Sequence, residues 1–145
     1  MSNEYDGYFR HLFQRVKVAT KVPFREVRLN GWEPKMNDCH ANVDYWIQHH
    51  PETKAVRGWL FWELDEVGQC LFMTHSVLDE NGSLVDITPI DQNTPCDGLL
   101  FLQHVGTEEE FLVMRIPCSQ VLYPPIAVDE WRESQLAMLP EPTEI

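Results

Sequence analysis

The chain has 145 residues, of which 43% are hydrophobic and 23% charged, and its formal net charge is -12. This length and composition indicate one folded domain with its own core and exclude a disordered chain. The negative charge argues against nucleic acid as a partner, because a phosphate backbone requires a basic surface. A basic partner or substrate stays open, although solubility alone accounts for the charge.

The sequence offers no sign of a membrane segment or a secretion signal. No apolar run is long enough to cross a bilayer, and residues 1–6 lack the basic and apolar regions of a signal peptide. We therefore expect a cytoplasmic protein with no membrane partner. The spacing of the cysteines is too irregular for a zinc ribbon, so we interpret all of them as free thiols: Cys39, Cys70, Cys96 and Cys118.

The first half of the chain predicts two helices with a short strand between them. Apolar residues at helical spacing favour an amphipathic helix over about the first twenty residues, ended by Pro23. Residues 24–29 alternate and suggest a short strand, and Asn30-Gly31 indicates a turn. A second helix is expected over residues 38–50, with Asn37 or Asp38 as its N-cap and a proline after its end.

The pattern then changes to strands, which we expect over residues 56–64, 69–78 and 83–88. Asp79-Glu-Asn-Gly82 is typical of a hairpin turn. In that hairpin His75 and Asp86 come to nearly the same level and share a face, whereas a register slip of one residue would separate them.

The last part of the chain is less regular. Residues 99–105 predict a strand. Residues 106–110 fit either the capped start of a short helix or a hairpin turn, and we prefer the hairpin, leading to a strand over residues 111–116. A last helix is expected over 129–139. The whole is an α+β fold with a single domain over residues 1–140 and a short flexible tail over 141–145.

Three residues have the chemistry and the order of a cysteine nucleophile site. Cys39 begins a helix, whose dipole favours the thiolate. His75 can take the thiol proton, and Asp86 can orient the imidazole. The oxyanion would lie against the backbone N–H of Cys39 and one side-chain donor, for which Asn37 and then Asn42 are the candidates.

Each of these residues also has a structural interpretation. Cys39 can be a small buried hydrophobic residue and His75 a hydrogen-bonded core histidine. A zinc site at Cys39, His75 and Asp86 is a less favoured alternative, so we predict no metal and no cofactor. His40 is expected to be exposed or to lie behind the site, since adjacent helical residues do not face each other. Most tryptophans should be core, with Trp59 and Trp62 as candidates to line a substrate cleft.

The order of these residues resembles the transglutaminase-like branch of the papain-like cysteine enzymes. The segment His75-Ser-Val-Leu-Asp-Glu-Asn-Gly-Ser-Leu-Val-Asp86-Ile-Thr-Pro89 is similar to the one that carries the second and third catalytic residues in that group. A weaker likeness links Cys39-His-Ala-Asn-Val43, His75-Ser-Val-Leu78 and Pro95-Cys96 to the N-terminal glutamine amidohydrolases. The resemblance covers residues 37–96 and implies N-terminal helices packed on an antiparallel sheet.

Two hypotheses about function follow. The first is a cysteine-dependent hydrolase or acyltransferase, of the amidase, peptidase or transglutaminase kind, which acts on an amide or ester carbonyl through a Cys39–His75–Asp86 triad. Its substrate would be a peptide or a small amide. The second is a non-catalytic binding or interaction protein that retains the same fold.

Overall fold

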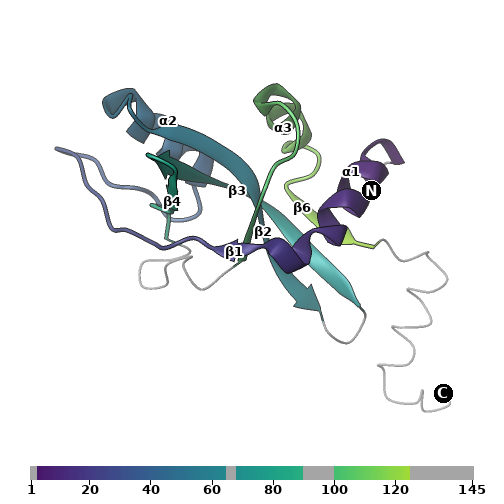
Figure 1. Ribbon diagram of the computed structural model, residues 1–145. Helices are drawn as coiled ribbons and strands as arrows, with labels where there is room; N and C mark the ends of the chain where they lie inside the picture. Colours follow the sequence, from purple (N-terminus) through teal and green to yellow (C-terminus); the bar gives the residue numbers. More distant parts are fainter. Residues whose placement is uncertain (1–2, 65–67, 90–99, 125–145) are drawn as a thin grey trace, which may run out of the picture.

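The computed structural model describes residues 3–64, 68–89 and 100–124. Within these ranges, three α-helices accompany a six-stranded antiparallel sheet, which confirms the predicted α+β class. The strand order is β1-β5-β2-β3-β4, and β6 also pairs with β3. Figure 1 shows the helices placed along one side of the long β2–β3 pair.

The elements have the following bounds. The helices are α1 (Asp6–Gln14), α2 (Cys39–His49) and α3 (Glu108–Met114), and two short 3-10 helices, η1 (Asn3–Tyr5) and η2 (Val16–Val18), flank α1. The strands are β1 (Thr20–Lys21), β2 (Lys54–Leu64), β3 (Gln69–Glu80), β4 (Ser83–Val85), β5 (Leu100–Gln103) and β6 (Gln120–Tyr123).

The predicted hairpin between β3 and β4 is present, and its turn is shorter than the predicted turn over residues 79–82. Glu80 pairs with Ser83, so Asn81 and Gly82 alone connect the strands. Both have positive φ, 54° and 89°, which is the conformation of a type I′ turn and suits Asn-Gly. This turn fixes the register of β4, and with it the face on which Asp86 lies.

The two faces of the sheet bury different cores, because successive strand residues point to opposite sides. Toward the helices, one core lies beneath α1 and α3 and includes Phe9, Trp59, Phe72 and Phe111. A second core lies beneath α2 and includes Val43, Trp46, Leu78 and Val85. The other face of the sheet carries a third core, made by Val22, Leu60, Val77 and Phe101.

One edge of β3 is shared by two short strands. β4 pairs with residues 78–80 of β3, and β6 pairs with residues 70–73. Residues 74–77 lie between these two registers, and the Thr74 N–H there donates to the Ser119 carbonyl at 3.1 Å. The first turn of α2 packs on this part of β3, because the His40 ring contacts Thr74 and Ser76.

Four of the predicted elements are present with small changes of bounds. The second helix begins one residue later and ends one residue earlier than expected. The strand expected over 56–64 begins two residues earlier, and the strand expected over 69–78 ends two residues later. The strand over 99–105 is present as β5. Among the described helices, none is both long and apolar enough to cross a membrane.

The first helix is shorter than the sequence predicts. α1 ends at Gln14, and the chain continues through a 3-10 turn into β1. The β-branched residues Val16 and Val18 favour this end of the helix, since their χ1 freedom is restricted against a preceding helical turn. The expected strand over 24–29 is also wrong. This segment makes single bridges, Phe24 with Asp86 and Leu29 with Trp32, because its backbone bonds go to Asp86 and to the Asn30-Gly31 turn.

The preference for a hairpin after Gly106 is wrong, because the segment forms helix α3. Thr107 caps the helix, with its hydroxyl accepting from the backbone N–H of Glu110 at 3.2 Å. Phe111 and Met114 are buried three residues apart on one helix face, whereas Val113 is 65% exposed. Burial at helical spacing outweighs the strand propensity of this run. The predicted helix over 129–139, the tail and Cys96 lie outside the described residues.

Candidate active site

Cys39 is the first residue of α2, and the chain before it is held in a turn. Asn37 has a left-handed φ of 57°, which asparagine tolerates, and its backbone N–H donates to the Pro89 carbonyl at 3.1 Å. Asp38 occupies the N-cap position without a side-chain hydrogen bond to the helix. The backbone N–H groups of the first turn are therefore not capped by Asp38. Cys39 is 8% exposed, beside exposed Asn37 and Asp38.

His75 and Asp86 form a buried pair. Nε2 of His75 lies 2.6 Å from Oδ2 of Asp86, and the two residues are 3% and 1% exposed. The second carboxylate oxygen accepts from the backbone N–H of Thr88 at 2.9 Å. The backbone of Asp86 is bonded on both sides, to the Pro23 carbonyl and the Arg25 N–H. The carboxylate is thus fixed, and Nδ1 is the ring nitrogen of His75 left for another partner.

The hairpin explains why these two side chains meet. Leu78 pairs with Val85, so extending the register by one pair places Asp86 opposite Val77, on the face that His75 shares. Val85 faces α2 instead, within the core beneath that helix. This register therefore places His75 and Asp86 on the same face of the sheet, as predicted.

Two imidazoles shift the pKa of the Cys39 thiol. Burial by itself raises the pKa of the thiol, but hydrogen bonding and charge from His40 and His75 outweigh burial and lower the pKa to about 6. Burial alone lowers the pKa of His75, whereas hydrogen bonding and charge from Asp86 and Cys39 raise that pKa to about 10. Between these two values the pair exists as thiolate and imidazolium, a form suited to nucleophilic attack.

Gly58 supports the position of His75, although no pattern in the sequence singles it out. It pairs with His75 across the β2–β3 ladder. A Cβ built on Gly58 would collide with the Leu102 carbonyl and would lie 2.6 Å from Cζ of Phe101. The Phe101 ring also packs edge-to-face on the His75 imidazole, with centroids 6.3 Å apart. A side chain at Gly58 would therefore displace the ring that packs on His75.

Asn42 has no amide hydrogen left for an oxyanion. Its Nδ2 donates to the Lys35 carbonyl at 2.8 Å and to Oγ1 of Thr88 at 2.9 Å, and its Oδ1 accepts from the Lys35 N–H. Asn42 is 2% exposed. It ties α2 both to the segment that leads to Cys39 and to the turn that follows Asp86. Asn37 stays a candidate donor, since its side chain is exposed beside Cys39.

The structure does not bring Trp59 to the site. Trp59 is fully buried beneath α1 and α3, and its Nε1–H donates to the Tyr8 hydroxyl at 2.7 Å. The expected role in a cleft is wrong for Trp59, because side chains alternate along β2 and that of Trp59 points into the core beneath the helices. Trp62 points to the other face as expected, but it pairs with Leu71, four residues from His75 and roughly 13 Å along the strand.

His40 lies closer to the site than its position in the sequence suggested. Its ring contacts Ser76 and Thr74 of β3, and it contributes to the lowered pKa of Cys39. Thr74 and Ser76 alternate with His75 along β3, so His40 lies on the helix-facing side of the strand, opposite to the face of His75. Within the ranges 3–64, 68–89 and 100–124, no group of three or more His, Cys, Asp or Glu side chains is arranged to hold a metal ion.

Comparisons with protein-family models, curated proteins and solved structures find no match for this chain. The fold class and the site geometry therefore come from this molecule alone.

Proposed function

We propose that this chain is a cysteine-dependent hydrolase or acyltransferase of the transglutaminase-like, papain-like kind, acting on the amide or ester carbonyl of a peptide or small amide. The observation that carries the proposal is the connected set of Cys39, His75 and Asp86. The His75 imidazole lies 2.6 Å from the buried Asp86 carboxylate, and His75, together with His40, lowers the pKa of the Cys39 thiol. A buried structural cysteine requires neither partner.

The proposed reaction has two steps. The Cys39 thiolate attacks the carbonyl carbon, and the resulting oxyanion accepts from the backbone N–H of Cys39. When the C–N or C–O bond breaks, Nδ1 of His75 gives its proton to the leaving group, and a thioester remains on Cys39. Water or an amine then attacks the thioester, His75 takes the proton of the attacking group, and the C–S bond breaks. Asp86 keeps the imidazole oriented throughout.

A simple ester tests this proposal without knowledge of the natural substrate. The protein is mixed with p-nitrophenyl acetate near pH 7, release of nitrophenolate is followed, and the acetylated peptide is located by mass spectrometry. We expect a burst of nitrophenolate and an acetyl group on Cys39. Cys39→Ala should lose both, and Cys70→Ala should keep both. Acetylation of Cys39 no faster than that of the other thiols would favour the non-catalytic protein of the same fold.

A further inference from the structure

A pocket lies between the N-terminal segment and helix α3. Its volume is about 430 Å³, within the range of roughly 300–1,000 Å³ that is usual for small-molecule sites. Tyr5 of η1 and Tyr8 of α1 line it on one side, and His104 lines it from the segment that leads to α3. The rest of its wall belongs to α3. None of its lining residues in the described part of the chain belongs to the proposed triad.

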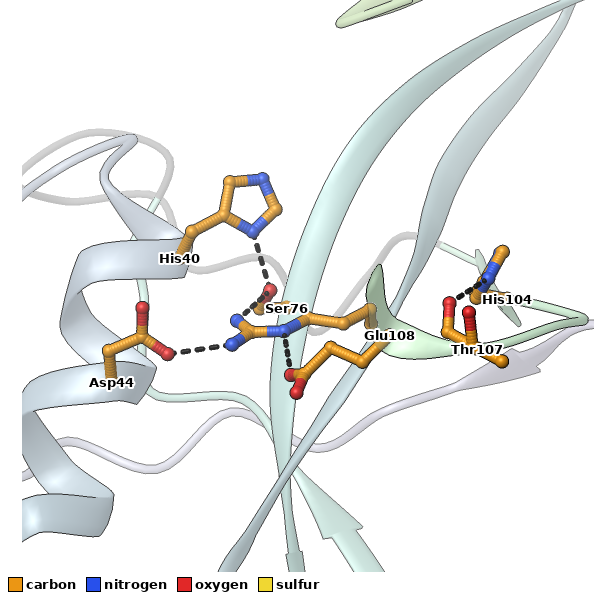
Figure 2. Close-up of polar contacts among 7 residues, drawn as sticks. His40, Asp44, Ser76, His104, Thr107 and Glu108 are labelled. Atoms are coloured by element: carbon orange, nitrogen blue, oxygen red, sulfur yellow. Dashed lines mark hydrogen bonds and ion pairs between the residues drawn. The ribbon is translucent and has the colours of Figure 1, made fainter. Parts of the chain in front are cut away.

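A chain of hydrogen bonds fixes the side chains at the base of this pocket. Nε1–H of Trp59 donates to the Tyr8 hydroxyl at 2.7 Å, and the Tyr8 oxygen lies 2.7 Å from Nδ1 of His104. Nε2 of His104 lies 2.8 Å from the Thr107 carbonyl oxygen, a contact that Figure 2 shows. A carbonyl only accepts, so Nε2 carries a hydrogen, and Nδ1 of the neutral ring accepts from the Tyr8 hydroxyl.

Burial keeps both groups in these protonation states near pH 7. It raises the pKa of Tyr8 to about 12, so the hydroxyl keeps its hydrogen. It also lowers the pKa of His104, although the Thr107 carbonyl and the Glu110 carboxylate act in the opposite direction. The hydrogens of Tyr8 and His104 are therefore both used within the protein. These two residues offer a ligand aromatic surface but no hydrogen-bond donor.

Helix α3 adds carboxylates and apolar side chains to the wall of the pocket. Glu109 and Val113 are four residues apart, as are Glu110 and Met114, so each carboxylate lies one helical turn from an apolar side chain on the same face. The wall thus has a negative part near the start of the helix and an apolar part near its end. A ligand that matches it has a cationic group at one end and an apolar body at the other.

The two carboxylates have no cation of their own among the described residues. Glu109 and Glu110 are exposed, and neither is part of an ion pair in the ranges that the structure describes. Their neighbour Glu108 instead pairs with Arg57 at 2.9 Å, outside the lining of this pocket. The Glu110 carboxylate lies near the pocket base, because a Cβ built on Gly106 would be 2.8 Å from its Oε2 and 3.1 Å from Nε2 of His104.

We propose that this pocket is a second site, which binds a small organic cation with its apolar body against the tyrosines and Met114 and its ammonium group beside Glu109 and Glu110. The proposal goes beyond the proposed function, because the pocket uses no residue of the triad. Carboxylates only accept hydrogen bonds, which an ammonium group supplies, and tyrosine ring faces attract cations as well. The same arrangement disfavours an anion, since it would meet two negative groups and no donor from Tyr8 or His104.

A pair of simple compounds tests the proposal. 2-Phenylethylamine carries an aromatic ring and an ammonium group near pH 7, and 2-phenylethanol has the same apolar body without the charge. Each is titrated at low ionic strength into isotope-labelled native protein, and the amide resonances are followed by NMR. We expect the amine to shift resonances of the lining residues with a Kd on the order of 1 mM, and the alcohol to bind about fivefold more weakly or less.

Substitutions then separate the charge from the shape of the pocket. The double variant Glu109→Gln and Glu110→Gln removes both charges and keeps the size of the side chains. Its affinity for the amine should fall to that for the alcohol, and its affinity for the alcohol should stay native, which shows that the pocket is intact. The matched control is Glu26→Gln with Glu33→Gln, two exposed carboxylates beside Arg28, which changes the net charge equally and should leave amine binding native.

Three results would overturn the proposal. The first is equal affinity of the native protein for the amine and the alcohol. The second is native amine binding in the double variant of Glu109 and Glu110. The third is an absence of shifts at the lining residues with the amine at about 20 mM, well above the expected Kd. Cys39→Ala should bind the amine like the native protein, so a failure of this titration and a failure of the ester assay are independent results.

Discussion

The two ends of the sheet both bury cysteines, but they surround them with different side chains. Beneath α1 and α3, Cys70 and Cys118 lie among aromatic and aliphatic residues, and burial raises the pKa of both thiols. At the start of α2, Cys39 is buried as well, yet two imidazoles lower its pKa to about 6. Burial alone therefore makes a thiol less reactive, and the partners decide the direction of the shift.

The strongest way to break this comparison is to remove one cysteine from each end. Cys39→Ala should abolish acyl transfer, a loss of about a thousandfold or more, because no nucleophile remains. It should cost only about 1 kcal/mol of unfolding free energy. Cys70→Ala should leave Cys39 fully reactive and cost about 1 kcal/mol or more, through a cavity in the aromatic core. Denaturant unfolding and the ester assay measure the two effects. If Cys39→Ala is strongly destabilised and the native Cys39 thiol is inert, then Cys39 has a structural role and not a catalytic one.

The charge behind His75 is the next part to remove. Asp86→Asn keeps the shape of the side chain but takes away the negative charge that helps raise the pKa of His75. The imidazolium then loses its proton at lower pH and stabilises the thiolate less. We expect the alkylation rate of Cys39 near pH 7 to fall by roughly tenfold to a hundredfold. Asp6→Asn, at a partly exposed carboxylate paired with Arg10, is the control and should leave the alkylation rate of Cys39 unchanged. An unchanged rate in Asp86→Asn would mean that the carboxylate has no part in activating Cys39.

Gly58 sharpens the comparison, because it supports the reactive end of the sheet without touching the thiol. Gly58→Ala should cost about 1–3 kcal/mol, since the new methyl group meets the Leu102 carbonyl and the Phe101 ring. It should also lower the reactivity of Cys39 by moving the ring that packs on His75. Gly7→Ala in α1, where a Cβ meets nothing within 4 Å, is the control for unfolding free energy. Native stability in Gly58→Ala would show that Phe101 can move aside freely.

The smallest effect is expected at the cap of α3. Thr107→Ala removes the hydroxyl that accepts from the Glu110 N–H and should cost about 1 kcal/mol, whereas Thr107→Ser should keep most of the stability. The reactivity of Cys39 should change little, because Thr107 contacts neither imidazole of the site. A large loss of reactivity would indicate that helix α3 affects the site more strongly than expected.

Local signals carried most of what the sequence predicted correctly. Asn81-Gly82 determines the hairpin register, and that register is what directs Asp86 toward His75. The start of α2 at Cys39 follows from the change between an irregular polar segment and a helical apolar pattern. These features depend on neighbours close in the chain, so one sequence is enough to infer them.

The errors concern residues whose roles depend on distant parts of the chain. Phe111 and its neighbours have strand propensity, and the burial of Phe111 and Met114 over β2 favours a helix instead. Asn42 is committed to Lys35 and Thr88, which no spacing reveals. Gly58 matters because Phe101, forty-three positions later, lies over it. Such contacts arise from the tertiary fold and leave no local pattern in the sequence.

The pH dependence of Cys39 alkylation tests the central claim most directly. The native protein is treated with limiting iodoacetamide at a series of pH values, and peptide mass spectrometry resolves all four cysteines. A thiol whose pKa is lowered becomes reactive above that pKa, so Cys39 should react with a midpoint near pH 6, well before Cys70 and Cys118. A midpoint for Cys39 at a pH of about 8.5, the pKa of an ordinary thiol, would contradict the thiolate–imidazolium pair.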